Sequence, residues 1–294
     1  MAYTNDVAAL NPQNWADSIQ ENIYKELSAK EVGDLRFKKN LSAGSRVHFP
    51  MFGALSATAY VKGADVTVQA FDSTDEYLDV DQQWESSFYL DTIDKKQNLY
   101  SAMQAGIREL TDALAQKVET VFYAEVLNAH DTFDAGDSGM GGSSGSAIAL
   151  TTNNVATMFA RAKAKLRKKL GGKKMLGNIV CVVDSDVAGV IEEKATTAGF
   201  NVADAAFKNG YAGDYMGVKI YISESIDMTT DSRKHCYFGL AKQIGMAMQI
   251  EGPSMQIDND PLKFGKIVKG LEVFGVKTFT RRADRFLDLQ VTVA

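Results

Sequence analysis

The chain has 294 residues, of which 45 % are hydrophobic and 23 % are charged, as is typical of a protein that buries a core. Its formal net charge of −5 argues against a nucleic-acid binder that works through overall positive charge. No run of eighteen apolar residues predicts a membrane span, and the first ten residues lack the basic start and apolar segment of a signal peptide.

The first predicted element is a short amphipathic helix. Asn11 is suited to the N-cap position, with Pro12 in the first turn. Apolar residues then recur at every fourth position and give one stripe along the helix; they are Trp15, Ile19, Ile23 and Leu27.

A strand-like stretch runs from Ser45 to Leu90. Its period-2 alternation predicts strands, with turns between them. The alternating runs are Val47–Phe49, closed by Pro50; Val66–Ala70; Leu78–Val80; and Trp84–Leu90. The simplest arrangement is a long antiparallel hairpin that reaches roughly 50 Å at about 3.3 Å per residue. Because an isolated pair of strands is marginal in water, the hairpin is expected to lie on its own domain or on a neighbouring subunit.

One very long amphipathic helix is predicted over Ile93–Ala129, capped by Asp91 or Thr92. At 1.5 Å per residue it would be roughly 55 Å long, which exceeds the width of a small domain. Its apolar positions follow a 3.6-residue period; they are Ile93, Leu99, Met103, Ile107, Leu110, Leu114, Val118, Val121 and Phe122.

Residues 134–146 are rich in Gly and Ser and predict a flexible surface loop, which lacks the Gly-Lys-Ser/Thr ending of a phosphate loop. The next helix is predicted over residues 153–170, with Phe159, Ala162, Leu166 and Leu170 on one side. Its other faces are strongly basic and carry Arg161, Lys163, Lys165, Arg167, Lys168 and Lys169.

Three interpretations of this basic helix remain open. It can be a solvated face, or a surface that neutralises DNA phosphates without reading sequence. It can also pair with an acidic region on a neighbouring copy, which comprises Asp72, Asp75, Glu76, Asp79, Asp81 and Glu85.

The second half of the chain predicts several short strands and a further helix. The strands are residues 179–183, 218–223, 236–240, 244–250, 271–280 and 287–293, and the helix covers about 187–194 after an Asp-Ser-Asp cap. No regular strand–helix–strand repeat is visible, so the fold class is mixed α+β.

The strongest enzyme-like pattern is the strand Ile179–Val183 followed by Asp184 and Asp186. It resembles the first motif of haloacid-dehalogenase-type phosphohydrolases, in which one Asp attacks phosphorus and the second protonates the leaving oxygen. The simpler interpretation is a strand followed by an Asp-capped helix, and no further residues complete a magnesium site. His48, His130 and His235 are widely separated, and Cys181 and Cys236 share no metal-like spacing, so these residues are expected in surface or packing positions.

Taken in order, these segments resemble the major capsid proteins of tailed phages with the Hong Kong 97-type fold. The helix with Trp15 resembles the N-arm of that family, Gly44–Pro50 the strand into its E-loop, and Trp84–Asp91 the return strand. The helix from Ile93 resembles the spine helix, and Asn178–Asp186 resembles the core of the A-domain. Gly213–Ser225 is similar to a glycine-then-strand segment of the family, and Phe264–Lys277 resembles the closing strand that returns to the P-domain.

The resemblance implies a division of the chain and a set of contact residues. The expected parts are the N-arm (1–32), the E-loop region (33–92), the P-domain with the spine and basic helices (93–177), the A-domain (178–268) and closing strands that return to the P-domain (269–294). Expected E-loop contacts between subunits are Phe52, Leu55, Tyr60, Lys62, Val66, Val68 and Phe71, and expected N-arm contacts are Trp15, Ile19 and Ile23. Charge contacts or DNA-facing positions are assigned to Arg161, Lys165, Lys168 and Lys169.

The function implied by the resemblance is a structural protein, not an enzyme, with no cofactor and no metal. Its copies would form pentamers and hexamers of an icosahedral shell around double-stranded phage DNA, in the virion and, during assembly, in the host cytoplasm. A separate scaffolding protein, a portal protein and non-specifically bound DNA are the implied partners, and no membrane is involved. Some members crosslink through an E-loop lysine; Lys62 lies in that region, without a matched acceptor. The alternatives are an encapsulin-type cellular shell and, in another class, a phosphohydrolase that uses Asp184 and Asp186.

Overall fold

A computed structural model of the chain describes residues 28–36, 46–53, 55–63, 65–97, 102–137, 139–170, 178–197, 211–226, 233–248 and 254–293. Helices and strands are mixed along the chain without a regular repeat, which confirms the α+β class. Within these ranges, no helix is both long enough and apolar enough to cross a membrane.

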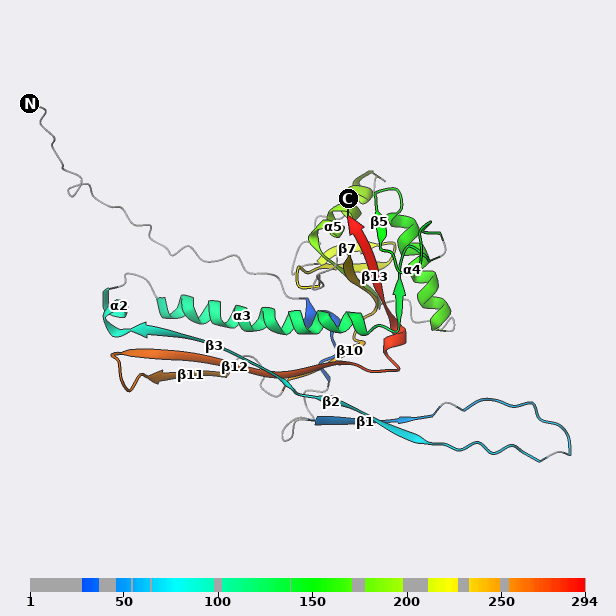
Figure 1. The fold of residues 1–294 in the computed structure, drawn as a ribbon, viewed down its shortest axis with the longest axis horizontal. Helices are drawn as coiled ribbons and strands as arrows, with labels where there is room; N and C mark the ends of the chain where they lie inside the picture. The colour runs from blue at the N-terminus through cyan, green and yellow to red at the C-terminus, as the bar shows by residue number, and fades with distance from the viewer. Residues whose placement is uncertain are drawn as a thin grey trace, which may run out of the picture.

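A seven-stranded mixed sheet forms one half of the molecule (Figure 1). Its order is β4-β13-β9-β6-β8-β7, and β5 also pairs with β13. The strands are β4 (Asp131–Phe133), β5 (Ile148–Leu150), β6 (Ile179–Val183), β7 (Tyr211–Tyr215), β8 (Val218–Ile222), β9 (Lys234–Leu240) and β13 (Phe286–Val293). All five residues of β6 are buried, as expected for a strand that is covered on both faces.

Helices α4 (Val155–Lys169) and α5 (Ser185–Thr197) cover one face of this sheet. Their apolar side chains form one buried cluster with alternate residues of the strands, including Cys181 and Cys236. Both cysteines are fully buried, which confirms that they are core residues. The other face packs against the end of α3 (Ala102–Ala124) through a second cluster that contains Phe122, Tyr237 and Phe286.

An elongated second sheet lies under α3 (Figure 1). Its longest strand is β12 (Gly265–Thr278), which pairs along one edge with β3 (Gln82–Asp91) and along the other with β11 (Ser254–Asn259) and β10 (Ile244–Met248). Val268 of β12 packs on Leu110 and Leu114 of α3. Gly270 lies too close to the Leu110 side chain to accept a Cβ, so a side chain there would push the helix away from the sheet.

The single helix predicted over Ile93–Ala129 is wrong in extent. The structure instead has α2 (Thr92–Gln97), α3, and the 3-10 helix η3 (Glu125–Asn128), and Figure 1 shows α2 running at an angle to α3. At the carboxyl end, Glu125 accepts a 2.8 Å hydrogen bond from the backbone N–H of Thr278, so a tertiary contact replaces a further α-helical turn. The middle of the predicted apolar stripe is buried, at Leu110, Leu114, Val118 and Phe122, whereas Ile93 is 61 % exposed; Leu99 lies outside the described residues.

We call residues 46–79 the arm. Its base is an antiparallel hairpin of β1 (Arg46–Phe52) and β2 (Ser73–Asp79), and its outer part is the connecting chain 53–72. β1 continues through Pro50, where the sequence predicted its end; an outer strand tolerates Pro because one of its edges needs no donor. The strand predicted over Trp84–Leu90 is present as β3, which confirms it. It pairs with β12, however, and β2 is the strand that pairs with β1.

The strand predicted over Val66–Ala70 is absent from the single chain, in which residues 65–72 form no strand. In the described part of the outer arm, the two limbs are joined by few contacts. These are the Gly53 N–H bond to the Asp72 carbonyl oxygen, the stacked rings of Phe52 and Phe71, and bonds between Ser56 and Gln69. Among the described residues, no ladder of backbone hydrogen bonds joins the two limbs here, so residues 66–70 have no partner strand in their own chain.

Membership of the two sheets also differs from the expected division of the chain. The expected A-domain, residues 178–268, includes β10 and β11, but these two strands pair in the elongated sheet. The expected P-domain, residues 93–177, includes β4, β5 and α4, but these elements pack with β6. The last strand, β13, pairs with β9 and does not return to the sheet of β12. The physical reason is that Leu287, Leu289 and Val291 are buried in the cluster under α4 and α5.

In its described residues, the Gly/Ser-rich segment 134–146 is an irregular and largely exposed loop, which confirms the predicted surface loop, and hydrogen bonds join its two ends. The Asp134 carboxylate accepts hydrogen bonds from the N–H groups of Gly136 (2.9 Å) and Gly145 (2.6 Å). The Ala135 N–H donates to the carbonyl oxygen of Ser146, which joins the two ends of the segment. One carboxylate therefore accepts hydrogen bonds from both ends of the segment.

Candidate assembly surfaces

The arm presents its predicted contact residues, from Phe52 outward, to solvent. Their exposed fractions are 52 % for Phe52, 61 % for Leu55, 73 % for Tyr60, 74 % for Val66, 90 % for Val68 and 58 % for Phe71. Lys62 is also exposed and lies at the tip, next to Gly63, whose φ of 84° permits the turn. So many exposed apolar side chains on one projection are unusual for an isolated protein and mark an interaction surface.

The base of the arm is fixed to the body of the protein. Arg46 and Asp79 form an ion pair across the hairpin, and His48 Nδ1 lies 2.5 Å from Asp75 Oδ2. Lys277 Nζ of β12 donates a 2.7 Å hydrogen bond to the carbonyl oxygen of Tyr77, and Arg281 donates to that of Phe52. The outer arm therefore projects from an anchored base.

A cavity of about 260 Å³ lies where the arm joins the body. Its lining combines three apolar side chains with one glutamate and three arginines, namely Phe49, Met51, Glu76, Phe279, Arg281, Arg282 and Arg285. Glu76 Oε1 accepts hydrogen bonds from the N–H and the hydroxyl of Thr280. Nothing local in the sequence indicates this cavity, because its walls come from segments about 200 residues apart.

Arg282 also links this cavity to the start of the described chain. Its Nη1 lies 2.8 Å from Asp34 Oδ2, and Arg36 forms a 2.7 Å contact with the same carboxylate. Burial alone would raise the pKa of Asp34, but the two arginines outweigh it and lower the pKa to about 2. Asp34 is thus held as a carboxylate at the junction of three segments.

A second buried anchor lies at the root of the amino-terminal segment. Glu119 Oε1 of α3 accepts hydrogen bonds from the N–H groups of Ser28 (2.6 Å) and Ala29 (3.3 Å), at the start of α1 (Ala29–Val32), and from Ser28 Oγ (3.1 Å). Ser28 Oγ is also 2.5 Å from the hydroxyl of Tyr123, whose pKa is raised by burial. The predicted helix at residues 11–27 and its contact residues Trp15, Ile19 and Ile23 lie outside the described residues.

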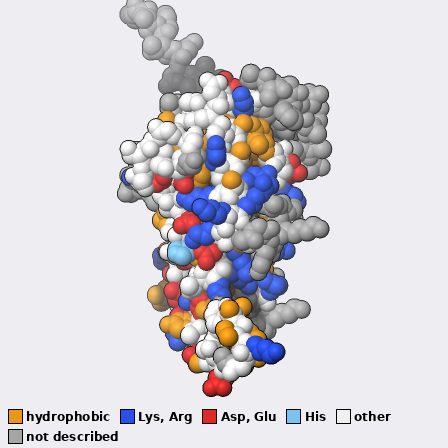
Figure 2. All heavy atoms as spheres, turned by 90° about the vertical axis from the view of Figure 1, so that its right-hand side faces the viewer, with side chains coloured by type: hydrophobic (Ala, Val, Ile, Leu, Met, Phe, Trp, Pro, Cys, Tyr) orange, Lys and Arg blue, Asp and Glu red, His pale blue; other side chains and the backbone are white. Residues whose placement is uncertain are grey.

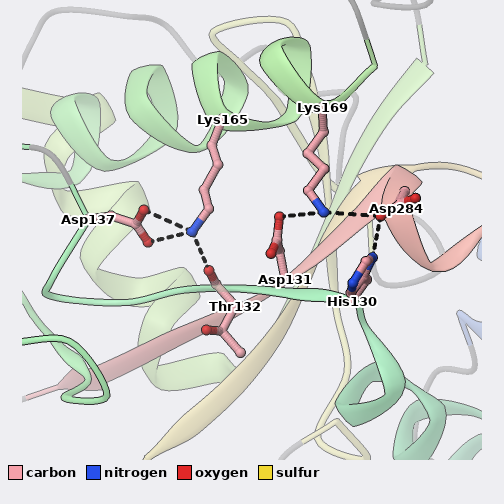
Figure 3. A network of polar contacts seen from close by, with 7 residues as sticks. All are labelled: His130, Asp131, Thr132, Asp137, Lys165, Lys169 and Asp284. Carbon is pink, nitrogen blue, oxygen red and sulfur yellow. Dashed lines mark hydrogen bonds and ion pairs between the residues drawn. The ribbon is translucent and has the colours of Figure 1, made fainter.

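The basic helix α4 is partly neutralised within the chain (Figure 3). Lys165 Nζ contacts both carboxylate oxygens of Asp137, at 2.8 and 2.9 Å, and the carbonyl oxygen of Thr132. Lys169 Nζ lies 2.9 Å from Asp131 and 3.1 Å from Asp284, and Asp131 chiefly accounts for the raised pKa of Lys169. These two lysines hold α4 against β4 and the 3-10 helix η5 (Ala283–Arg285).

The predicted charge contacts of α4 therefore divide into two pairs. Lys165 and Lys169 have partners in their own chain, whereas Arg161 and Lys168 are exposed. The predicted acidic partner region is also reduced, because Asp75 and Asp79 face His48 and Arg46 of the same hairpin. Figure 2, which faces the side from which the arm projects, still shows Lys and Arg side chains gathered across the middle of the molecule.

Asp184 and Asp186 are both bound by partners within the chain. Asp184 Oδ1 accepts a 3.0 Å hydrogen bond from the N–H of Val187 and so caps α5. Lys234 forms ion pairs with both Asp184 and Asp186. Burial alone would lower the pKa of Lys234, but these hydrogen bonds raise it above its usual value. Across the described ranges, no three His, Cys, Asp or Glu side chains are grouped as metal ligands.

Each histidine lies beside an aspartate: His48 beside Asp75, His130 beside Asp284, and His235 beside Asp288. The first two are exposed at the surface, and the third is buried within strand β9 of the seven-stranded sheet. All three occupy the surface or packing positions that their spacing predicted.

Comparison with known proteins gives one family and a consistent set of structures. Residues 86–285 match the family described as "Phage capsid protein". A structure from Mycobacterium phage Che8 is similar with a TM-score of 0.76 and 21 % identity, covering 97 % of each chain. The capsid structure of cyanophage P-SCSP1u is similar with a TM-score of 0.71 and 15 % identity, covering 99 % of this chain and 95 % of that one. The capsid of Myoviridae phage XM1 is similar with a TM-score of 0.69 and 12 % identity, covering 98 % of this chain and 99 % of that one. A search of the curated proteins found no match.

Proposed function

The chain belongs to the phage capsid protein family, as a structural protein and not an enzyme, and we propose that its copies form the pentamers and hexamers of an icosahedral shell around double-stranded phage DNA. The fold is the Hong Kong 97-type capsid fold that the sequence resembles. The family match does not favour the phosphohydrolase alternative, and the partners of Asp184 and Asp186 explain that motif as a helix cap with an ion pair.

The observation that carries this proposal is the arm. It combines a base that Lys277 and Arg281 hold to the body by hydrogen bonds with an outer part whose large apolar side chains are more than half exposed. Burial of one such side chain is worth about 1.5–3 kcal/mol, so an adjacent subunit that covers several of them gains substantial affinity. We assign the inter-subunit contacts to Phe52, Leu55, Tyr60, Lys62, Val66, Val68 and Phe71.

The amino-terminal segment has a parallel role in this proposal. Glu119 fixes its root to α3, and the apolar stripe of Trp15, Ile19 and Ile23 supplies contacts to neighbouring subunits. A separate scaffolding protein and a portal protein assist assembly in the host cytoplasm, and the finished shell is part of the virion.

Contact with packaged DNA is assigned to the exposed basic residues of α4. Arg161 and Lys168 are the candidates, because Lys165 and Lys169 already contact aspartates of their own chain. Such contacts would be independent of sequence and would weaken as the salt concentration rises.

Negative-stain electron microscopy of the expressed chain tests the proposal. Uniform closed shells or five- and six-membered rings are the expected result, and a protein that stays strictly monomeric at high concentration would refute it. Nucleic acid inside the particles distinguishes a phage shell from an encapsulin-type compartment, which would instead hold a packaged enzyme.

A further inference from the structure

The cavity where the arm joins the body, here called the arm-base cavity, has two walls of different character. Phe49, Met51 and Glu76 come from one face of the arm hairpin, in which Phe49 pairs with Glu76 across β1 and β2. The opposite wall consists of Phe279 and three arginines, from the turn between β12 and β13 that Figure 1 shows above the base of the arm. Its volume of about 260 Å³ is close to that of the smallest pockets that hold small-molecule ligands.

Glu76 brings a buried acceptor without a partner into this cavity. The residue is 9 % exposed, and its Oε1 accepts hydrogen bonds from the N–H and the hydroxyl of Thr280. Among the described residues, Oε2 of the same carboxylate has no hydrogen-bond partner. Buried carboxylate oxygens are nearly always bonded, because their desolvation is costly otherwise. The cavity therefore offers a fixed position for one N–H or O–H donor.

The arginines of the opposite wall supply donors for an anion. Within the described ranges, the Arg281 guanidinium bonds only to one carbonyl oxygen of the arm, and that of Arg285 only to one side-chain oxygen, at 3.4 Å. Each guanidinium carries five N–H donors, so most of them remain for another molecule. Arg282 is paired with Asp34, and the lining together with Asp34 keeps one net positive charge. The planar fork of arginine suits the oxygens of a phosphate.

The rest of the lining is apolar and mostly aromatic. The rings of Phe49 and Phe279 lie edge to face, with their centroids 4.8 Å apart. Phe279 is only 5 % exposed and packs in the cluster under the arm, which fixes its ring. Met51 adds a polarizable side chain that adapts to an aromatic neighbour. A flat ring suits this surface well, because aromatic pairs favour stacked and edge-to-face contacts.

A cytosine nucleotide matches all three parts of the lining at once. Its ring contacts the aromatic side chains, its phosphate oxygens accept hydrogen bonds from Arg281 and Arg285, and its exocyclic amino group donates to Glu76. Carboxylates are established acceptors for the cytosine amino group, whereas thymine presents a second acceptor at the same position. The small volume also suits a single pyrimidine nucleotide better than a double helix.

We propose that the arm-base cavity binds one cytosine nucleotide, with the amino group on Glu76 Oε2 and the phosphate on Arg281 and Arg285. A free nucleotide and the unpaired end of a strand present the same groups. Because Glu76 belongs to the arm and the arginines belong to the body, the ligand bridges the two and stabilises the position of the arm. The site is separate from the exposed basic residues of α4 and does not depend on the shell function.

Equilibrium dialysis of the full chain against single ligands tests the site. Deoxycytidine monophosphate is compared with deoxythymidine monophosphate, deoxycytidine and inorganic phosphate, which lack the amino group, the phosphate and the base, respectively. The monophosphate of deoxycytidine should bind at least about tenfold more tightly than each of the three, because a hydrogen bond to a charged group is worth about that factor or more. Equal binding of inorganic phosphate would reveal a simple anion site and overturn the proposal, as would the absence of saturable binding.

Three variants show which groups read the base and the phosphate. Glu76→Gln keeps an oxygen for Thr280 and adds a donor for thymine, so the preference for cytosine over thymine should fall about tenfold. Arg285→Gln should weaken both nucleotides about tenfold and leave the preference unchanged. Arg46→Gln is the matched control, because Arg46 lies at the base of the arm but outside the cavity lining. An unchanged preference in Glu76→Gln, or equal losses in Arg46→Gln and Arg285→Gln, would contradict the assignment.

Hydrogen exchange on the wild-type chain gives an independent measurement if a variant fails to fold. Deoxycytidine monophosphate should slow the exchange of backbone amides in β1 and β2 by about tenfold relative to the same concentration of deoxythymidine monophosphate. Equal exchange with both nucleotides would count against the site.

A short single-stranded oligodeoxycytidylate distinguishes the two sources of the ligand. Displacement of bound deoxycytidine monophosphate by this oligonucleotide supports an unpaired strand end, and retention of the monophosphate supports a free nucleotide.

Discussion

Replacement of Glu119 by Ala tests how the amino-terminal segment is anchored. Glu119 is 1 % exposed, and one of its oxygens accepts bonds from two backbone N–H groups and one hydroxyl at Ser28 and Ala29. These N–H groups begin α1, so they have no intrahelical acceptor. The carboxylate therefore caps a short helix from a residue about 90 positions away.

The magnitude follows from those bonds. A hydrogen bond to a charged acceptor contributes about 1.5–3 kcal/mol, and a buried donor left without an acceptor costs about 1–3 kcal/mol. The three bonds share one oxygen and are not additive, so we expect Glu119→Ala to lower the free energy of unfolding by about 3–5 kcal/mol. Glu119→Gln keeps a carbonyl acceptor and should lose roughly half as much.

Urea unfolding followed by circular dichroism measures this difference on unassembled protein. Glu31→Ala is the matched control, because it removes the same group from an exposed position on α1, and surface changes usually stay within about 0.5 kcal/mol. Equal midpoints for Glu119→Ala and Glu31→Ala would refute the anchor. Proteolysis after Ser28 should also be faster in Glu119→Ala.

Three further outcomes are expected. Deletion of residues 55–75 should leave a folded protomer by circular dichroism but no stable shells by microscopy, and normal particles would contradict the role of the arm. Lys169→Glu should lower the melting temperature because Lys169 contacts two aspartates. Lys168→Glu should leave the melting temperature unchanged and reduce DNA retention at raised salt. Identical behaviour of the two variants would contradict the division of α4 into paired and exposed basic residues. Asp34→Asn should lower the urea midpoint at neutral pH. The pKa of Asp34 falls from 3.8 to about 2 on folding. The stabilisation by its carboxylate is therefore present above about pH 4 and is lost as the pH falls through 2. A difference in urea midpoint between wild type and Asp34→Asn that does not change with pH would contradict this role.

Elements with a strong apolar period were predictable, because the period itself reports burial. The stripe at Leu110, Leu114 and Val118 is buried, and β6 with its Asp-capped helix lies where the sequence placed it. The ends of the long helix were not predictable, since contacts such as Glu125 with Thr278 depend on β12 being in place. Likewise, nothing local to Glu119 or Arg282 distinguishes them from exposed charges, because their partners are distant in sequence.

Two mismatches between local sequence and fold have opposite physical origins. On α4, two of the three open interpretations directed the basic residues at other molecules, and the structure shows that Lys165 and Lys169 bind aspartates that the fold brings from elsewhere in the same chain. In the arm, the sequence predicted a strand, but the fold brings no partner to Val66–Ala70. The lysines of α4 find their partners inside the subunit, so Lys165 and Lys169 are no longer candidates for contacts with other molecules. The second mismatch leaves apolar side chains and backbone groups exposed together, which a stable protein tolerates only where another copy covers them. This contrast is the reason for which we propose the arm, and not the basic helix, as the main assembly surface.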